Sequence, residues 1–334
     1  MSVQDLKDIF EGFKKLRILV IGDVMIDSYL WGDVSRISPE APVPIIAATS
    51  RENRLGGAAN VALNVQALGA IPILCSVIGK DDNGEVLLNL LDKGGLVNEG
   101  MVTTSKRATT VKTRIISQNQ HLLRVDEEIE SPLNNELEER LFLRAERMLE
   151  SYKIDAIIFE DYDKGVITPG LIEKVVTTAK EKGIPTLVDP KKRNFLDYKG
   201  VTFFKPNFKE FKEGLKLDIH KNQQDEMVTA ATRFQKDQSI RMLMVTMAEK
   251  GVFIQSDSKH QFIPAEVRDI SDVSGAGDTV ISVSALCLAS GMEPHLVARI
   301  ANMAGGLVCE SPGVVPVDKA KLIEECVDKK ILSE

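Results

Sequence analysis

Short apolar segments alternate with helix-length segments along most of this chain, and this alternation constrains the fold more than any other feature. Strands are expected at Arg17–Gly22, Ile73–Ile78, Ile154–Phe159, Pro185–Val188, Val201–Phe204 and Arg241–Val245. Helices are expected at Gly57–Leu68, Asp82–Lys93, Asn134–Ser151, Thr168–Lys182 and Gln224–Gln235. Because parallel strands are joined by crossovers, usually helices, the pattern predicts an α/β fold with a mostly parallel, doubly wound sheet and helices on both faces.

Two segments depart from this alternation. Residues 29–49 contain short alternating runs broken by prolines, and residues 108–126 contain two extended runs around Gln118-Asn119-Gln120, which is typical of a hairpin turn. We expect them to form a small antiparallel β lid. The lid would be inserted near the N-terminus of a single domain that spans residues 1–334.

The charge balance argues against nucleic acid as a partner. The chain carries 42 Lys and Arg against 49 Asp and Glu, for a net charge of −7, and no basic run stands out. Its four cysteines form no CxxC pair, which favours a reduced, cytoplasmic setting with buried thiols. No apolar stretch reaches the roughly 20 residues needed to cross a bilayer, and the N-terminus lacks a leader pattern, so we expect no membrane partner.

The segment Asp272–Thr279 is the strongest candidate for chemistry. Gly275, Ala276 and Gly277 let the backbone aim consecutive N–H groups at one point, and the apolar run from Val280 to Ala289 predicts a helix that begins there. The result is an anion pocket with Asp278 at its edge, where a carboxylate suits a base that deprotonates an attacking hydroxyl. At a helix N-terminus this carboxylate is expected to stay ionised. The alternative is a plain aspartate cap after a glycine turn.

Polar residues that follow other strands are weaker candidates, each with an ordinary alternative. Asn207 and Glu210 could face nucleotide phosphates and order water around Mg²⁺, or could simply form a helix capping box. Thr246 could bond a phosphate or lie in a plain turn. Lys164 could hold a sugar phosphate or lie in a solvated loop.

Three more candidates lie near the N-terminus. Asp27 could accept two sugar hydroxyls or be an ordinary loop aspartate. The small-residue helix start with Gly57 and Asn60 could meet a polar ligand or serve only close packing. Arg36 could reach a second phosphate or pair with Glu40.

Several enzyme classes lose support because their motifs are absent from the sequence. No G-x-x-x-x-G-K-[ST] loop is present, no G-x-G-x-x-G follows the first strand, and no G-x-S-x-G occurs. The four histidines share no ligand spacing, so we assign none of them to a metal or to catalysis.

Taken together, these motifs resemble the ribokinase-like (PfkB) family of carbohydrate kinases from about Arg17 to Val317. Asp272–Thr279 is similar to a signature of that family. Gly22–Asp27, Ser35–Pro44 and Gly56–Ala62 are similar to the kinase module of bacterial ADP-heptose synthesis. That resemblance implies ATP-dependent phosphorylation of O1 of D-glycero-D-manno-heptose 7-phosphate. The alternatives are another sugar or sugar phosphate as acceptor, or a non-catalytic binding protein on the same fold.

The resemblance also implies roles for individual residues. Asp278 would be the base, and the Gly275-Ala276-Gly277 amides would form the anion hole. Contacts to ATP and Mg²⁺ would come from Asn207, Phe208, Lys209, Glu210, Thr246, Gly251 and Asn302. Sugar contacts would come from Asp27, Arg36, Gly57, Asn60 and Lys164. A K⁺ site is implied at Asp272, Ser274 and Gly313.

The sequence departs from the family pattern at three places, and the resemblance also bears on partner proteins. Ala248 stands where many members carry glycine, the Gly-Gly-x-x-x-Asn spacing is one residue shorter, and Ser311–Pro316 is atypical. The His-x-Gly-His motif of a nucleotidyltransferase module is not found, so adenylyl transfer is expected from another protein. We expect a homodimer in which the lids of two copies pair with each other.

Overall fold

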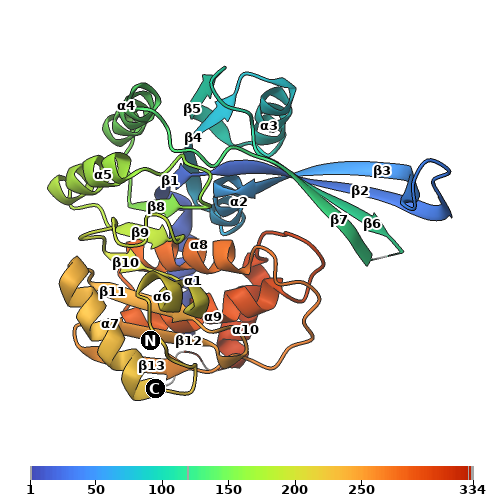
Figure 1. Ribbon diagram of the computed structural model, residues 1–334. Helices are drawn as coiled ribbons and strands as arrows, with labels where there is room; N and C mark the ends of the chain where they lie inside the picture. Colours follow the sequence, from blue (N-terminus) through green and yellow to red (C-terminus); the bar gives the residue numbers. More distant parts are fainter. Residues whose placement is uncertain (1, 119, 330, 332–334) are drawn as a thin grey trace.

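A computed structural model describes residues 2–118, 120–329 and 331, and a nine-stranded sheet forms its centre (Figure 1). The strands are β1 Arg17–Gly22, β4 Ile71–Gly79, β5 Val97–Thr104, β8 Ala156–Glu160, β9 Thr186–Asp189, β10 Phe203–Phe204, β11 Met242–Thr246, β12 Val252–Ser256 and β13 Lys259–Ile263. Their order is β13-β12-β11-β10-β9-β8-β1-β4-β5. Pairing is parallel except for β11-β12 and β12-β13, so the expected mostly parallel sheet is confirmed.

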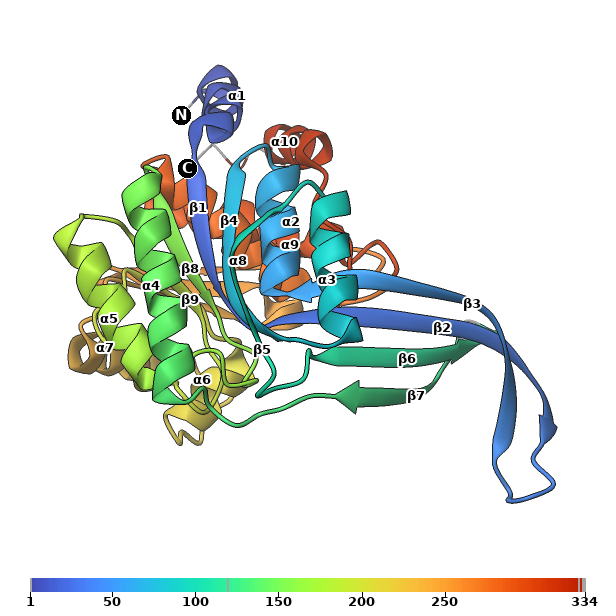
Figure 2. The same cartoon turned by 90° about the horizontal axis from the view of Figure 1, so that it is seen from above.

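Helices cover both faces of this sheet (Figure 2). They are α1 Val3–Gly12, α2 Ala58–Ala67, α3 Asp82–Lys93, α4 Asn135–Ser151, α5 Pro169–Glu181, α6 Phe208–Gly214, α7 Gln224–Gln238, α8 Ala276–Ala289, α9 Pro294–Val308 and α10 Lys319–Asp328, with 3-10 turns at Phe13–Lys15 and Ala248–Lys250. Successive residues of a strand face opposite sides, so β1 contributes to two cores. Ile18 and Val20 join the core under α2, α8 and α9, whereas Leu19 and Ile21 join the core under α4, α5 and α7.

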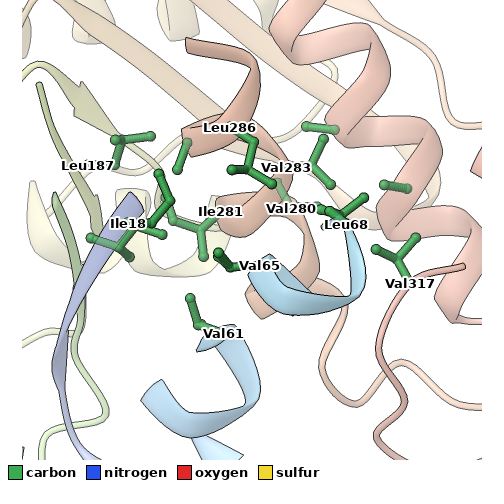
Figure 3. Close-up of a cluster of buried hydrophobic side chains, with 14 of the residues drawn as sticks. Ile18, Val61, Val65, Leu68, Leu187, Val280, Ile281, Val283, Leu286 and Val317 are labelled. Carbon is green, nitrogen blue, oxygen red and sulfur yellow. The ribbon is translucent and has the colours of Figure 1, made fainter. Parts of the chain in front are cut away.

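Helix α8 lies in the middle of the first core and is buried almost all round (Figure 3). Its side chains Ile281 and Leu286 pack with Val65 of α2 and Ile18 of β1. A helix that is apolar on every side has one stable place, inside the protein. The burial of α8 therefore fixes the position of its first turn, which carries the Asp278 motif.

Strand β5 and the lid differ from expectation in detail. The sequence pattern misses β5 because its first three residues are exposed and two of them, Asn98 and Glu99, are polar. The lid is a second sheet of β2 Val24–Ile37, β3 Pro44–Gly57, β6 Val111–Ser117 and β7 Gln120–Glu127, in the order β3-β2-β6-β7.

The two hairpins of the lid are antiparallel as expected, but β2 and β6 pair in parallel, which corrects the wholly antiparallel lid. The physical reason is that β2 and β6 both leave the body at the same end and run outward side by side (Figure 2). Asn119, at the predicted turn between β6 and β7, lies outside the described residues.

Two further sequence expectations concern cysteines and membrane spans. Each of the four cysteines is a free, buried thiol, as expected. Within the part of the chain that the structure describes, no helix has both the length and the apolarity needed to cross a bilayer.

Candidate active site

The carboxyl ends of the parallel strands gather the candidate residues at one edge of the main sheet. Gly22 ends β1, Glu160 ends β8, Asp189 ends β9 and Thr246 ends β11. These ends lie side by side because the strands run the same way, and in open α/β sheets ligands bind at this edge. The first turn of α8 brings Asp278 to the same place, where its carboxylate meets those of Glu160 and Asp189.

Two side chains hold the carboxylate of Asp278. The amide Nδ2 of Asn60 donates to Oδ2 at 2.6 Å, and the hydroxyl of Tyr162 donates to Oδ1 at 2.8 Å. Asp278 is only 4 % exposed and Asn60 1 %. The predicted base and one predicted sugar contact are therefore neighbours in a buried site.

Packing between α2 and α8 explains why Asn60 and Asp278 meet. The hydroxyl of Thr279 donates to Oδ1 of Asn64 at 3.0 Å, and the hydroxyl of Ser282 donates to the Val61 carbonyl at 3.2 Å. These two buried bonds fix the helices in register, so that residues of their first turns face each other. Gly57 precedes α2 with a φ of 59°, a left-handed conformation that glycine adopts without strain.

The predicted anion pocket falls on the glycine turn before Asp278. Gly275 has a φ of 79° and begins α8 as its N-cap. A Cβ placed on Gly277 would lie 3.4 Å from Oδ2 of Asp189 and 3.6 Å from Nζ of Lys205. The amide turn therefore lies beside the buried ion pair of Asp189 and Lys205.

Three buried carboxylates meet beside this turn. Each of Glu160, Asp189 and Asp278 offers an oxygen within 4.8 Å of the others. Lys205 pairs with Asp189 at 2.7 Å, and Lys191 lies 3.7 Å from the same carboxylate. Two ammonium groups therefore face this cluster of carboxylates.

Glu160 is the unpaired member of the trio. It is 0 % exposed, and neither of its carboxyl oxygens has a hydrogen-bond partner among the described residues. Burial raises the pKa of Glu160 well above its ordinary value, and the charges of Asp189 and Asp278 raise it further. Both effects favour the protonated form of Glu160, which would offer one donor and one acceptor.

The pKa of Asp278 is higher than a helix N-terminus alone would give. Burial raises the pKa of Asp278 to about 6, against the hydrogen bonds from Asn60 and Tyr162, which favour the ionised form. The helix N-terminus alone suggested a carboxylate that is ionised throughout. The carboxylate is still mostly ionised at pH 7, and its raised pKa makes it a better proton acceptor.

Asp27 lies in β2 near the point where the lid leaves the body. Its Oδ1 pairs with the guanidinium of Arg114 from β6. A Cβ placed on Gly56 of β3 would come within 2.2 Å of Oδ2 of Asp27. The carboxylate is 5 % exposed, and it occupies space that only a glycine at position 56 leaves open.

The two remaining expected sugar contacts are Arg36 and Lys164. Arg36 is exposed at the outer end of β2, opposite Ile45. Arg36 lies about 30 Å along the strand from Asp27, so it cannot reach Asp278 of its own chain. The ammonium of Lys164 is held at 2.8 Å by each of Glu128 and Glu130, at the base of the lid.

Four of the nucleotide candidates, Asn207 to Glu210, lie at the start of helix α6. Asn207 and Glu210 form the capping box of α6, with bonds of 2.8 and 2.9 Å, and Asn207 bridges to Thr246 of β11. The capping box that was the alternative to a nucleotide contact is therefore present. It leaves the side-chain amide nitrogen of Asn207 available to a ligand. Phe208 packs partly into the second core, and Lys209 is exposed.

Gly251 and Asn302 both contact the segment after β13. Gly251 has a φ of 84°, and a Cβ there would lie 2.0 Å from the Ile263 carbonyl, so close packing alone requires this glycine. The amide of Asn302 donates to the Pro264 carbonyl at 2.9 Å. Asn302 also lines a cavity of about 380 Å³ with Pro264 and Met303. Ala248, three residues before Gly251, has a φ of 53°, a conformation that suits the glycine expected at this position from the resemblance.

The three K⁺ candidates meet through one side chain. Oδ1 of Asp272 accepts the Ser274 N–H at 2.9 Å, and Oδ2 accepts the Gly313 N–H at 3.1 Å. Burial opposes ionisation of Asp272, but these backbone bonds outweigh it and lower its pKa. The carboxylate therefore joins the loop before α8 to the loop after α9 and remains charged.

Sequence reasoning missed several residues of the site. Tyr162, Glu160, Asp189, Lys191 and Lys205 all lie within it, yet only their position after strand ends signalled them. Lys191 pairs with Glu210 at 2.7 Å and lies over the Tyr162 ring, 5.4 Å from its centroid. Burial opposes the charge of Lys191, but Asp189 and Glu210 outweigh it and raise its pKa.

Comparison with known proteins identifies the family of the chain. The profile described as pfkB family carbohydrate kinase matches residues 15–320. The bifunctional protein HldE of Pelobacter propionicus is 38% identical over 97% of this chain and 66% of its own length. HldE of Koribacter versatilis is 39% identical over 92% of this chain and 62% of its own length. The chain thus spans slightly less than two thirds of these relatives.

Solved structures share the fold at low identity. Phosphofructokinase-2 from Escherichia coli, in complex with potassium, aligns with a TM-score of 0.77 and 18% identity, over 95% of this chain and 100% of that one. Ribokinase from Arabidopsis thaliana, complexed with ribose and ATP, aligns with a TM-score of 0.71 and 16% identity, over 92% and 99%. The ribokinase-like fold expected from the sequence is confirmed.

Proposed function

Because the chain belongs to the pfkB family of carbohydrate kinases, and is thereby an ATP-dependent sugar kinase, we propose that its acceptor is D-glycero-D-manno-heptose 7-phosphate. The γ-phosphoryl would go to O1, and the product would be the 1,7-bisphosphate used for ADP-heptose and surface glycan synthesis. Support comes from the HldE relatives, which are 38% identical over 97% of the chain. The motifs at Gly22–Asp27, Ser35–Pro44 and Gly56–Ala62 point to the same acceptor.

One observation carries the proposed chemistry: a buried carboxylate lies beside an amide turn. Asp278, held by Asn60 and Tyr162, follows directly on Gly275–Gly277. The acceptor oxygen would form a bond to the γ-phosphorus, while the bond from that phosphorus to the bridging oxygen of ADP breaks. The acceptor proton goes to Asp278. The turn amides and Lys205 hold the charge on the transferring group.

Mg²⁺ fits the expected place at Glu210. Each oxygen of this carboxylate makes one hydrogen bond, to Lys191 or to the Asn207 N–H, and so keeps a lone pair that can accept from a metal-bound water. When bound, Mg²⁺ supplies charge neutralisation for the nucleotide phosphates. Asn207 and Thr246 lie at the same sheet edge and would contact those phosphates.

Acceptor contacts would surround the base. Asn60 and Gly57 bring the first turn of α2 to it, and Asp27 lies at the base of the lid. We add Glu160, because its free carboxyl can pair with a sugar hydroxyl both as donor and as acceptor. An unpaired buried polar group costs about 1–3 kcal/mol, which a bound hydroxyl would recover.

The lid supports the expected homodimer. Its outer strands β3 and β7 have free edges, and apolar side chains are exposed on it, with Ile37 61% and Leu123 58% exposed. Such edges and patches are usually covered in a native assembly. Arg36, too distant for its own site, would then be free to approach the partner's site.

The acceptor is tested by ADP release with Mg-ATP and a panel of sugars: the heptose 7-phosphate, ribose, fructose and fructose 6-phosphate. The proposal expects the heptose phosphate to have the highest kcat/KM by at least about a hundredfold, a difference of some 2.7 kcal/mol in transition-state binding. A better rate with another sugar would replace the acceptor while keeping the kinase. No ADP from any acceptor would support a binding protein instead.

A further inference from the structure

The two oxygens of the Asp278 carboxylate have different partners. Oδ2 is bound by Asn60, which is expected to contact the sugar, whereas Oδ1 is bound by the Tyr162 hydroxyl. A sugar hydroxyl that arrives beside Asn60 therefore meets Oδ2 first. Oδ1 faces a phenol that belongs to the protein and has no assigned role in the reaction.

The backbone of Tyr162 is held by Asp23. Its N–H donates to Oδ2 of Asp23 at 2.8 Å, and Asp23 also accepts the N–H groups of Lys164 at 3.2 Å and Val166 at 3.0 Å. Asp23 is 1 % exposed and lies between β1 and β2. One buried carboxylate thus anchors the loop after β8, and with it the phenol that meets Asp278.

The ring of Tyr162 is held as well. The ammonium of Lys191 lies 5.4 Å from its centroid, within cation–π range. Burial raises the pKa of the Tyr162 phenol well above its ordinary value, so the hydroxyl keeps its proton and acts only as a donor toward Asp278.

We propose that Tyr162 is a positioning residue for phosphoryl transfer: its hydroxyl fixes Oδ1 of Asp278 and leaves Oδ2 as the oxygen that receives the acceptor proton. This inference rests on the proposed function for its catalytic meaning. The contact itself is a property of the protein and can be tested without turnover. Tyr162 does not touch the reacting atoms; it acts through Asp278.

The contact has a predictable electrostatic effect. A donor to the ionised form of a carboxylate lowers its pKa, so loss of the Tyr162 hydroxyl raises the pKa of Asp278. A hydrogen bond to a charged group corresponds to a shift of about one pH unit or more. The other groups that face Asp278 from the surrounding elements stay in place: Asn60, Glu160, Asp189, Lys191 and Lys205.

The first arm of the test is a direct titration. Tyr162→Phe removes only the hydroxyl and keeps the ring. The matched control is Tyr198→Phe, because the buried Tyr198 hydroxyl also donates to a carboxylate of the same loop, Asp161, at 2.9 Å, but does not touch Asp278. The pKa of Asp278 is read from carbon-13 shifts of labelled aspartates, assigned with Asp278→Asn.

The expected result is a rise of about one pH unit in the pKa of Asp278 in Tyr162→Phe and none in Tyr198→Phe. The second arm is the pH profile of kcat/KM, whose acidic limb moves upward by the same amount in Tyr162→Phe alone. Part of the lost activity returns at higher pH, which a folding defect would not produce.

Failure of the positioning role and failure of the proposed function would give different results. If Tyr162→Phe and the wild type titrate alike, the positioning role is overturned, whatever the activity. If the titration shifts as expected but the wild type transfers no phosphoryl group, the proposed function fails while the contact to Asp278 stands. A thermal melt of both variants confirms that each comparison is made on folded protein.

Discussion

Asn60 donates its side-chain amide to Oδ2 of Asp278 at 2.6 Å, across 218 residues of sequence. Both residues lie in the first turn of a buried helix, Asn60 in α2 and Asp278 in α8. The pair marks the side of the base on which the acceptor is expected, because Asn60 can pass its hydrogen bond from the carboxylate to a sugar oxygen.

Asn60→Ala is expected to weaken acceptor binding more than ATP binding. The variant removes a donor to a charged group, a change of about 1.5–3 kcal/mol, so the acceptor KM should rise about tenfold or more while the ATP KM stays unchanged. Steady-state kinetics with each substrate varied in turn measures this. Asn98→Ala is the control, because the Asn98 side chain is exposed and donates to Asp92, away from the site. Equal rises in both KM values would contradict the assignment.

Glu160→Gln is expected to stabilise the fold at high pH. Because the folded pKa of Glu160 lies above its unfolded value, the native state binds its proton more tightly, and stability falls as pH rises from about 4.3 through the folded pKa. Glutamine cannot lose a proton, so the variant should gain about 1 kcal/mol or more over the wild type at pH 8, but little at pH 4.

Urea unfolding at pH 4 and pH 8 gives this difference, with the exposed Glu150→Gln as a matched control. The stability curve of Glu160→Gln should fall less steeply with pH, although Asp278, whose pKa is also raised, keeps part of the slope. An identical pH dependence in the variant and the wild type would show that the pKa of Glu160 is not raised in the folded protein.

Gly56→Ala tests the position of Asp27. The added Cβ would lie 2.2 Å from Oδ2 of Asp27, so the carboxylate must move. Overpacking of this kind costs about 1–3 kcal/mol, and the acceptor KM should rise by about tenfold. Gly12→Ala is the control, because nothing lies within 4 Å of its Cβ. Unchanged acceptor kinetics in Gly56→Ala would remove Asp27 from the sugar site.

A monovalent cation is expected to act through Asp272. Its carboxylate holds the Ser274 and Gly313 amides together, and K⁺ bound there would order the loop before α8. Activity should be higher in KCl than in tetramethylammonium chloride at equal ionic strength, and Asp272→Ala should lose that difference. The exposed Asp269→Asn should keep it. A wild type that is indifferent to the cation would refute the site.

The sequence predicts the sheet and the helix start that carries Asp278 well, because both depend on local patterns. Apolar strands followed by polar residues identify the ligand edge, and Gly275–Asp278 identifies the anion turn. In the loop after β8, the contacts of each side chain depend on the path of the backbone. Asp163 has a φ of 58° and reverses the chain, so Tyr162 faces Asp278 while Lys164 faces Glu128. No local pattern distinguishes the two.

Two other differences also arise from tertiary structure. The helix N-terminus at Asp278 is visible in the sequence, but its burial between two other carboxylates is not, and burial raises its pKa. The lid strand β2 runs from Val24 to Ile37, longer than expected, and carries Arg36 far from the base. Sequence periodicity gives the presence of a strand more reliably than its length.

The central claim is that Asp278 is the base of phosphoryl transfer to a sugar hydroxyl. The most direct measurement is the kcat of wild type and Asp278→Asn with Mg-ATP and the best acceptor, beside ATP affinity by calorimetry. The account predicts unchanged ATP binding and a kcat at least about a hundredfold lower, within the range of general-base effects. Turnover of Asp278→Asn at the wild-type rate would contradict it.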